Sequence, residues 1–420
     1  MRNDGPGMSR GTKIILGLTA VILLLSAAFL FSISGKDITN RAEQFLLQLE
    51  QNRKSQVQTD DEAELARVQE QSATPKPETE ATAEPKATPA PEIHFSIAAA
   101  GTVNAPRLIR ESVLQDDGDY DFLPVFEGIS QAMQGADMSI VTLETMTAEN
   151  LPYQSYNAPP SLLSALKQIG IDLVSLATEH ALDHGYEALA LTRADLNSAG
   201  LSWCGLEGED TRFSIGGLRI AVLSGTYGFS EQSHRNGDTD RISSLGQAIT
   251  NKIASVRADG VNLVIVIPHW GIKNSPDISE EMRIQAREWA AAGADLILGA
   301  HPNVVLPSEM LHVERPDGRL HDCLVYYSLG ALLTDGRNAE NSAGVIARIS
   351  LYYDPESRLV DFERVNNFPT YIAQVKKEDE QNWRVLIAGE DLPDLPWEEQ
   401  QGALSAKAII EEVLDATENP

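Results

Sequence analysis

From residue 93 onward, short apolar runs alternate with segments whose apolar residues recur at helical spacing. The apolar runs predict strands, and the most strongly β-branched of them is VNLVIVI at residues 261–267. Gly216-Gly217 separates two such runs and predicts a hairpin, because glycine tolerates the positive φ of tight turns. The predicted strands are 94–100, 138–143, 172–177, 212–215, 218–223, 261–267, 296–298, 324–327, 345–353 and 359–365. The predicted helices are 124–134, 161–169, 186–199, 243–258, 278–292 and 403–416.

This alternation is typical of a layered α/β domain with helices on both faces. Strands 345–353 and 359–365 are expected to close the domain as an antiparallel pair. The segment 403–416 has apolar residues at helical spacing and is expected to dock as a last helix. We therefore predict an α/β domain over residues 93–370, followed by an acidic C-terminal extension with a docking helix over 371–420.

The chain before residue 93 has a different pattern. Residues 14–33 form a 20-residue stretch without a charged side chain, and about 20 apolar residues span the hydrocarbon core of a bilayer. The basic residues flanking it lie almost wholly on its N-terminal side, which predicts that the N-terminus is inside. A cleavable signal peptide is the alternative, but FSISG at 31–35 is a poor cleavage site.

These features predict a single-pass protein of the plasma membrane whose main domain is on the extracytoplasmic face. Residues 1–13 would be the cytoplasmic tail and residues 14–33 the transmembrane helix. Residues 34–92 are polar and end in TPKPETEATAEPKATPAPE, which has no apolar periodicity. Such a segment cannot bury a core, so we expect a disordered stalk between the anchor and the domain.

The charge of the chain agrees with this topology and excludes one class of partner. The 420 residues include 61 acidic and 33 basic side chains, a net charge of −28. The first 35 residues carry three basic side chains against one acidic, so the remainder carries −30. A charge of this sign argues against nucleic acid as a partner, because phosphate binding depends on Lys and Arg. With only Cys204 and Cys323, a multi-thiolate zinc site is excluded, whereas a disulfide between them stays possible in an exported domain.

Candidate chemistry lies just past the predicted strands. Glu144, His180, His269 and His301 each follow an apolar run closely. Ligands of open α/β sheets gather at the carboxyl ends of strands, and imidazole with carboxylate from separate loops is a common divalent-metal donor set. A single histidine at a strand end is more often structural, but three at equivalent positions favour a shared site.

At this point the sequence resembles the CapA/PgsA capsule-synthesis family, membrane-anchored proteins linked to poly-γ-glutamate production and related to calcineurin-like metallophosphoesterases. The resemblance covers residues 93–353, most of the predicted ectodomain. It is carried by ADMSIVTLE at 136–144, SALKQIGIDLVSLATEHALDHG at 164–185, HWG at 269–271, GAHP at 299–302 and YSLG at 327–330. The resemblance implies a multilayer α/β sandwich of the metallophosphoesterase type.

The resemblance also implies roles for individual residues. Glu144, Glu179, His269 and His301 would be ligands of a divalent metal such as Mn, Fe or Zn. His180 would lie near the reacting group and act as a catalytic residue.

The chain departs from the family pattern in several places: Glu179 stands where the family has Asn, and two expected metal-ligand positions are replaced. Thr102 stands where the family has a metal-binding Asp, and Asn303 stands where it has a second His. A two-metal clamp needs ligands for both ions, and these two neutral replacements predict the loss of one of the two ions.

Two functions follow from these observations. In the first, the protein takes part in the synthesis, export or modification of an anionic surface polymer such as poly-γ-glutamate. Its site would be degenerate, with one metal or none, and its partner would be the polymer or the synthase complex. In the alternative, the protein is an active metal-dependent phosphoesterase or hydrolase of the cell envelope.

Three neighbouring residues have structural alternatives. His184 lies four residues after His180, a spacing that could chelate zinc on a helix. Asp183 and Gly185 instead favour a turn there, with Asp183 as the N-cap of the following helix. Trp270 could be a substrate platform, although core packing is the more common role of such an aromatic.

Overall fold

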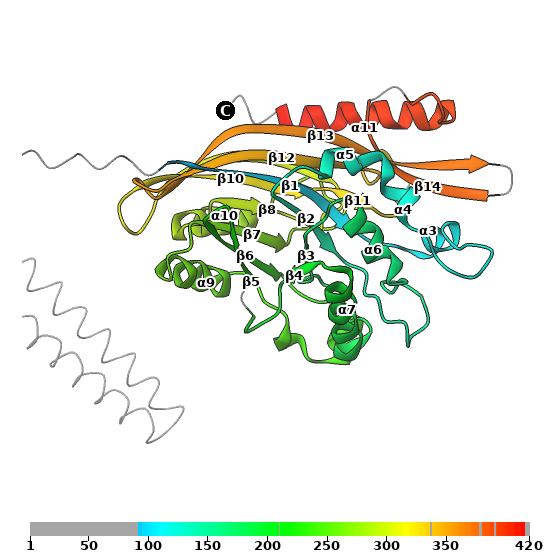
Figure 1. Ribbon diagram of the computed structural model, residues 1–420, viewed down its shortest axis with the longest axis horizontal. Coiled ribbons are helices and arrows are strands. Elements are labelled where there is room, and N and C mark those ends of the chain that lie inside the picture. Colours follow the sequence, from blue (N-terminus) through cyan, green and yellow to red (C-terminus); the bar gives the residue numbers. More distant parts are fainter. Residues whose placement is uncertain (1–90, 210, 337, 378–379, 390–391, 416–420) are drawn as a thin grey trace, which may run out of the picture. The chain divides into compact units, whose positions relative to one another are not determined.

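The computed structural model describes residues 91–415 except positions 210, 337, 378–379 and 390–391 (Figure 1). The predicted tail and anchor, and the predicted stalk as far as residue 90, therefore lie outside the described residues. Among the residues that are described, no helix is long and apolar enough to cross a membrane.

Within this described part, the strands form two sheets (Figure 1). The eight-stranded sheet has the order β14-β13-β12-β1-β2-β3-β4, and β11 pairs with β1. Its strands are β1 (Ile93–Val103), β2 (Met138–Leu143), β3 (Leu173–Ser175), β4 (Ser202–Cys204), β11 (Ala331–Leu333), β12 (Ala343–Asp354), β13 (Leu359–Lys377) and β14 (Glu380–Ile387). The six-stranded sheet has the order β5-β6-β7-β8-β10-β9. Its strands are β5 (Thr211–Ile215), β6 (Leu218–Thr226), β7 (Leu263–His269), β8 (Leu296–Leu298), β9 (Val305–Glu314) and β10 (Leu320–Leu329).

Helices cover the outer face of each sheet, so the described domain has the layers helix, sheet, sheet, helix. The first sheet is covered by α3 (Arg107–Ser112), α4 (Leu123–Phe126), α5 (Ser130–Met133), α6 (Ser161–Gln168) and α7 (Gly185–Ala199). The second sheet is covered by α9 (Gln247–Ala258) and α10 (Glu280–Ala292), which lie side by side (Figure 1). The short α8 (Glu231–Asn236) lies beside α7, and α11 (Trp397–Asp415) runs along β13 (Figure 1). The predicted α/β layering is confirmed.

Alternation of side chains along each strand builds the two faces. In β2, Ile140 belongs to the core shared by the two sheets, whereas Val141 packs under the helices of the first sheet. In β7, Ile265 joins the shared core and its neighbours Val264 and Val266 pack under α9 and α10. Successive strand side chains point to opposite faces, so an uninterrupted apolar run is what a strand buried on both faces requires.

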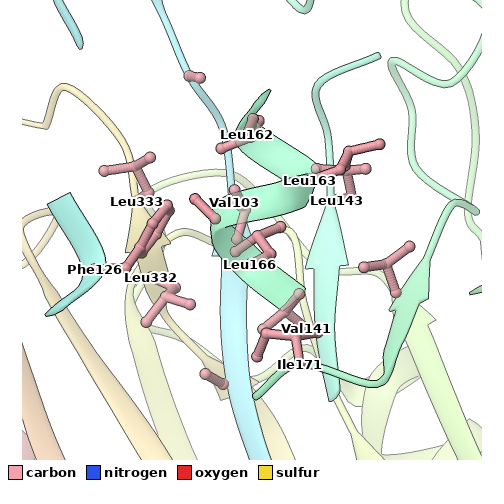
Figure 2. Packing of buried hydrophobic residues seen from close by; sticks show 14 of the residues in the cluster. Val103, Phe126, Val141, Leu143, Leu162, Leu163, Leu166, Ile171, Leu332 and Leu333 are labelled. Carbon is pink, nitrogen blue, oxygen red and sulfur yellow. The ribbon is translucent and has the colours of Figure 1, made fainter. Parts of the chain in front are cut away.

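The first helical layer is fixed to its sheet by leucines of α6. Figure 2 shows Leu162 and Leu166 of α6 over Val103 of β1 and Val141 of β2. These side chains are at most 1% exposed, and burial of each leucine contributes roughly 2 kcal/mol. This packing holds the carboxyl ends of β1 and β2 in place.

Several predicted elements have different bounds in the structure. The antiparallel pairing of 345–353 with 359–365 is confirmed, since Ile349 pairs with Val365. The single helix predicted at 124–134 is wrong, because α4, a 3-10 turn (Glu127–Ile129) and α5 replace it. A Cβ on Gly128 would lie 2.7 Å from the carbonyl oxygen of Val385, so close packing on β14 accompanies the break.

Two further differences concern turns and strand length. The helix predicted at 243–258 starts only at Gln247, because Thr226 of β6 hydrogen-bonds Ser243 and Leu245 and Gly246 has a φ of 76°. β13 runs without interruption through residue 370, the predicted boundary. Residues after 370 therefore extend the same sheet, and α11 packs into the core between the sheets, as a docking helix would.

The two cysteines are both buried and free. Cys204 lies in the core between the sheets and Cys323 lies under α9 and α10. They therefore form no disulfide here.

Gly101→Ala is expected to destabilise the domain. A Cβ at this position of β1 would lie 2.0 Å from the carbonyl oxygen of Gly330, and overpacking of this kind costs about 2–3 kcal/mol. Gly228→Ala is the matched control, because no atom lies within 4 Å of its added Cβ. Urea unfolding of the two full-length variants measures the difference, and equal stabilities would contradict the packing described here.

Candidate metal centre

The carboxyl ends of strands from both sheets meet at one edge of the domain. Thr102 lies at the end of β1 and Glu144 directly follows β2 in the first sheet. In the second sheet His269 ends β7, and His301 follows β8. A bridge between His269 and Ala300 aligns these last two positions.

Glu144, His269 and His301 form a compact buried group. Their exposed fractions are 1%, 1% and 3%, and one potential ligand atom of each lies within 4.8 Å of the others. His269 Nε2 is 3.1 Å from Glu144 Oε1, and the ring centroids of the two histidines are 4.7 Å apart. This group is the metal-capable cluster among the described residues.

The unsatisfied atoms of this group fit a divalent ion. Among the described residues, His269 Nδ1 and His301 Nδ1 are buried and have no hydrogen-bond partner. A buried polar atom without a partner costs about 1–3 kcal/mol, and a coordinated ion would remove that cost at a nitrogen it binds. Two imidazoles and a carboxylate are a donor set that suits Zn, Mn or Fe with a position left open.

The electrostatics of His301 favour the ligand form. Burial, followed by the proximity of His269, lowers the pKa of His301 to about 4. The ring is therefore neutral near pH 7 and keeps a nitrogen lone pair. Neutral imidazole is the form that coordinates metals.

Glu179 lies beside this group without being part of it. Its Oε2 is 3.1 Å from His301 Nδ1 and accepts a hydrogen bond of 2.8 Å from the hydroxyl of Tyr227. Burial alone would raise the pKa of Glu179, but His180 and then His301 lower it to about 2. Three of the four predicted ligands therefore cluster together, and the fourth, Glu179, lies beside them as an ionised carboxylate.

His180 lies on the far side of Glu179 and is held in place from three directions. Its Nδ1 is 2.7 Å from Asp183 Oδ2, and its Nε2 is 2.9 Å from Glu179 Oε1, the latter too far off line for a hydrogen bond. Tyr156 stacks on its ring at 3.5 Å. Burial would lower its pKa, but Asp183 and then Glu179 raise it to about 9, so the ring is protonated near neutral pH. Its catalytic role stays a prediction.

The two residues predicted to depart from the family pattern, Thr102 and Asn303, are both buried. Thr102 is 1% exposed, and its hydroxyl has no hydrogen-bond partner among the described residues. Its backbone N–H donates to Gly330 as a strand residue would. Asn303 is 8% exposed and lines the adjoining cleft.

A polar cleft of about 260 Å³ adjoins the buried group. The residues lining it are Asn104, Pro106, Ser155, Tyr156, Lys273, Asn274, Asn303, Thr334, Asp335, Gly336 and Asn341. Tyr156, Asn274 and Asn303 of this lining have φ near 59°, and the adjacent His301 has φ of 99°. Left-handed backbone at non-glycine residues collects at functional sites, and here it marks the cleft and the metal-capable group together.

The contacts of Asp183, His184 and Trp270 decide between the alternative roles stated for them above. Asp183 does not cap α7 as predicted, because its carboxylate accepts hydrogen bonds from Ser230 and Ser233 and lies beside His180. His184 lies in the predicted turn and hydrogen-bonds the carbonyl of Ser155. Trp270 is 2% exposed and stacks on Trp289 and Tyr327, so it is a core residue.

Three residues of the site were not predicted from the sequence. Tyr227 follows β6, which extends three residues beyond the predicted strand end at 223, so a longer strand would have placed it with the other strand-end residues. Tyr156 and Lys273 come from loops without regular spacing. Only the three-dimensional packing brings those two to the cleft.

Comparison with known proteins then identifies the family. The family described as "Bacterial capsule synthesis protein PGA_cap" matches residues 96–336, more than half of the chain. The chain belongs to this family. The resemblance inferred from the sequence motifs is thereby confirmed.

Two curated relatives carry capsule-related names. The "PGA biosynthesis protein CapA" of Bacillus subtilis (strain 168) is 26% identical over 184 residues, which are 41% of this chain and 45% of that protein. The "Capsule biosynthesis protein CapA" of Bacillus anthracis is 24% identical over 254 residues, 56% of this chain and 58% of that protein. The chain therefore spans about half the length of the curated relatives it matches.

Solved structures similar to this chain include phosphoesterases. A calcineurin-like phosphoesterase of Bacillus subtilis has a TM-score of 0.41 and 11% identity, covering 77% of this chain and 98% of that one. A 5'-nucleotidase precursor of Thermus thermophilus has a TM-score of 0.39 and 13% identity, covering 78% of this chain and 60% of that one. The family assignment rests on the sequence match and not on these structural scores.

The purified full-length chain is expected to bind about one divalent ion at Glu144, His269 and His301. His269→Ala and His301→Ala should each weaken Mn²⁺ or Zn²⁺ binding more than about a hundredfold, because a direct ligand matters more than an outer-shell partner. His312→Ala is the control, since its side chain is 73% exposed on another part of the domain. Elemental analysis and calorimetry measure this, and equal metal content in all variants would exclude the site.

In the metal-free domain, protonated His180 is expected to increase the free energy of unfolding. With a folded pKa of about 9, its contribution is complete below the unfolded pKa of about 6.5 and is lost as the pH rises through 9. His180→Gln should therefore lose about 2 kcal/mol relative to the wild type at pH 6 and much less at pH 10. Urea unfolding in EDTA at both pH values measures the difference. A pH-independent difference would contradict the protonated state inferred for His180.

Proposed function

We propose that the chain acts in the biosynthesis of an anionic surface polymer, such as poly-γ-glutamate, by binding an anionic group of that polymer. The observation that carries this proposal is the buried Glu144, His269 and His301 group beside a polar cleft. Family membership and the capsule-related names of the relatives support the choice of polymer. The partner is the polymer or the synthase complex that makes it.

Different residues of the site would hold the ion and surround it with charge. Glu144, His269 and His301 would hold one divalent ion of the Mn, Fe or Zn class. When bound, such an ion supplies positive charge and Lewis acidity toward an anionic group. Glu179, ionised and hydrogen-bonded by the Tyr227 hydroxyl, lies 3.1 Å from His301 Nδ1 and would add negative charge beside the ion.

The cleft supplies the remaining recognition. Lys273 lines it, and the ammonium group of Lys273 has no ion-pair or hydrogen-bond partner among the described residues. Asn104, Asn274 and Asn303 add amide donors to the same cleft. In a chain of net charge −28, an unpaired cation beside a metal-capable group is a local attraction for carboxylate or phosphate.

Binding is favoured over hydrolysis because the site supports one ion. The neutral Thr102 and Asn303 replace two expected ligands, and the compact cluster among the described residues contains three donors. In-line displacement by a two-metal clamp needs ligands for both ions. A metal-dependent phosphoesterase or hydrolase is the second candidate, and it is favoured by the neutral, buried His301 beside an ionised carboxylate.

The proposal includes a location for the protein at the plasma membrane. The uncharged residues 14–33 and the net charge of +2 over the first 35 residues support a plasma-membrane anchor with the N-terminus inside. The domain would then meet the polymer on the extracytoplasmic face.

The full-length chain in detergent with Mn²⁺ is expected to bind poly-γ-glutamate without cleaving it. Lys273→Gln should weaken binding about tenfold, because a charge-assisted hydrogen bond is worth roughly 1.5 kcal/mol. Lys252→Gln is the charge-matched control, since Lys252 of α9 is paired with Glu207. Light scattering and calorimetry follow binding, and release of product from poly-γ-glutamate or a generic phosphodiester follows cleavage.

The outcomes separate the two functions. Turnover that depends on Mn²⁺ and disappears in His269→Ala would replace the binding role by the hydrolase. Absence of both binding and turnover would overturn the proposed function altogether.

A further inference from the structure

A second cavity, of about 530 Å³, lies away from the metal-capable group and is lined by five arginines. These are Arg219, Arg257, Arg315, Arg319 and Arg358. Cavities of this volume are typical of small-molecule sites. The feature is unusual in this chain, because acidic side chains outnumber basic ones by 61 to 33.

The arginine cavity is at the opposite ends of the strands from the metal-capable group. Asn262 of its lining immediately precedes β7, whereas His269 is the last residue of β7. Seven strand residues span about 20 Å. The cavity is therefore a separate site and does not share residues with the cleft.

Segments from both sheets contribute to the cavity. Arg219 is at the start of β6, and Arg358 is in the turn between β12 and β13. Arg315 and Arg319 are in the turn between β9 and β10, and Arg257 is at the end of α9. Five arginines from four segments thus converge on one space.

Two of the arginines, Arg257 and Arg315, form contacts that stabilise the fold. Arg257 forms an ion pair with the buried Asp295 and donates to the carbonyl of Gly293, and Arg315 contacts Asp295 at 3.2 Å. These contacts hold the turn between α10 and β8 and explain why both side chains are present. They do not account for the other three.

Two of the remaining arginines leave positive charge uncompensated. Arg319 is paired with Asp317, whereas the guanidinium of Arg219 donates, among the described residues, only to the backbone carbonyl of Asp259. The guanidinium of Arg358 has no ion-pair or hydrogen-bond partner among the described residues. With Asp295 and Asp317 as the carboxylates in contact, five positive charges face two negative ones.

A buried donor also lacks a partner at this cavity. Arg315 is 6% exposed, and its Nε has no hydrogen-bond acceptor among the described residues. Buried polar groups are normally paired, and an unpaired one needs an explanation. Because the Nε atom is itself inaccessible, its unpaired N–H adds positive potential beside the cavity without a direct contact to a ligand.

We propose that this cavity binds carboxylate groups of an anionic polymer segment. The guanidinium fork matches a carboxylate with two parallel hydrogen bonds, and several arginines around one cavity suit a ligand that carries several carboxylates. Phosphate shares this chemistry, so the test includes it. The choice of a polycarboxylate rests on the proposed function, whereas the existence of an anion site does not.

The test measures binding of hexa-γ-glutamate to the full-length chain in detergent and EDTA, which removes any contribution from a metal. Arg358→Gly is the main variant, because residue 358 has φ of 58°, a conformation that glycine adopts without strain. Its thermal unfolding should therefore match that of the wild type. Arg358→Gly and Arg219→Gln should each weaken binding about tenfold.

Arg364→Gln is the matched control, since Arg364 is exposed on β13 and does not line the cavity. It makes the same change in net charge, and binding should stay within about twofold. Equal binding by wild type, Arg358→Gly and Arg219→Gln would overturn the proposal. Binding of inorganic phosphate with no binding of hexa-γ-glutamate would overturn the polycarboxylate assignment. Loss of binding on adding EDTA would assign the polymer to the metal site and overturn this one, so the two proposals fail separately.

Discussion

The contact between Glu144 and His269 joins the two sheets at the site, and it depends on how those sheets pack. The two residues are 125 positions apart in sequence, yet their side chains lie 3.1 Å from each other. No local interaction brings them together. The apolar core between the sheets does, through side chains such as Ile140 of β2 and Ile265 of β7. Because protein interiors are close-packed, a change in sheet separation would move one ligand away from the others.

The same two-sheet packing organises charge at both ends of the strands. At the carboxyl ends, burial keeps His301 neutral and places it beside carboxylates, an arrangement that attracts a cation. At the amino ends, arginines outnumber carboxylates around one cavity, an arrangement that attracts an anion. Net charge alone, at −28, indicates neither feature. The positions of the charged groups in the fold therefore indicate which ligands can bind better than the net charge of the chain does.

The sequence predicts the layers and the strand-end residues because both are local patterns. Residues 138–143 form β2 as predicted, and the ligand candidate after it follows directly. The edge strand β14 was missed because its sequence, EQNWRVLI, is not a continuous apolar run. The irregular stretch at 124–134 depends on a close approach of Gly128 to β14, a contact distant in sequence. The sequence does not predict the arginine cavity for a related reason, since its residues come from separate strand, helix and turn segments spread over residues 219–358.

In the proposed function, Thr102 changes the chemistry of the site without moving its backbone. The backbone of Thr102 is fixed by pairing with Thr142 and Ala331, which does not depend on its side chain. Nearby, His301 and Asn303 keep left-handed backbone, which for such residues costs roughly 1–2 kcal/mol each and persists only where the surrounding fold imposes it. Under the proposed function, this backbone geometry is kept while residue 102 supplies no carboxylate ligand. In that proposal, one ion would orient and bind an anionic group, whereas displacement between two ions would need a further donor that threonine does not supply.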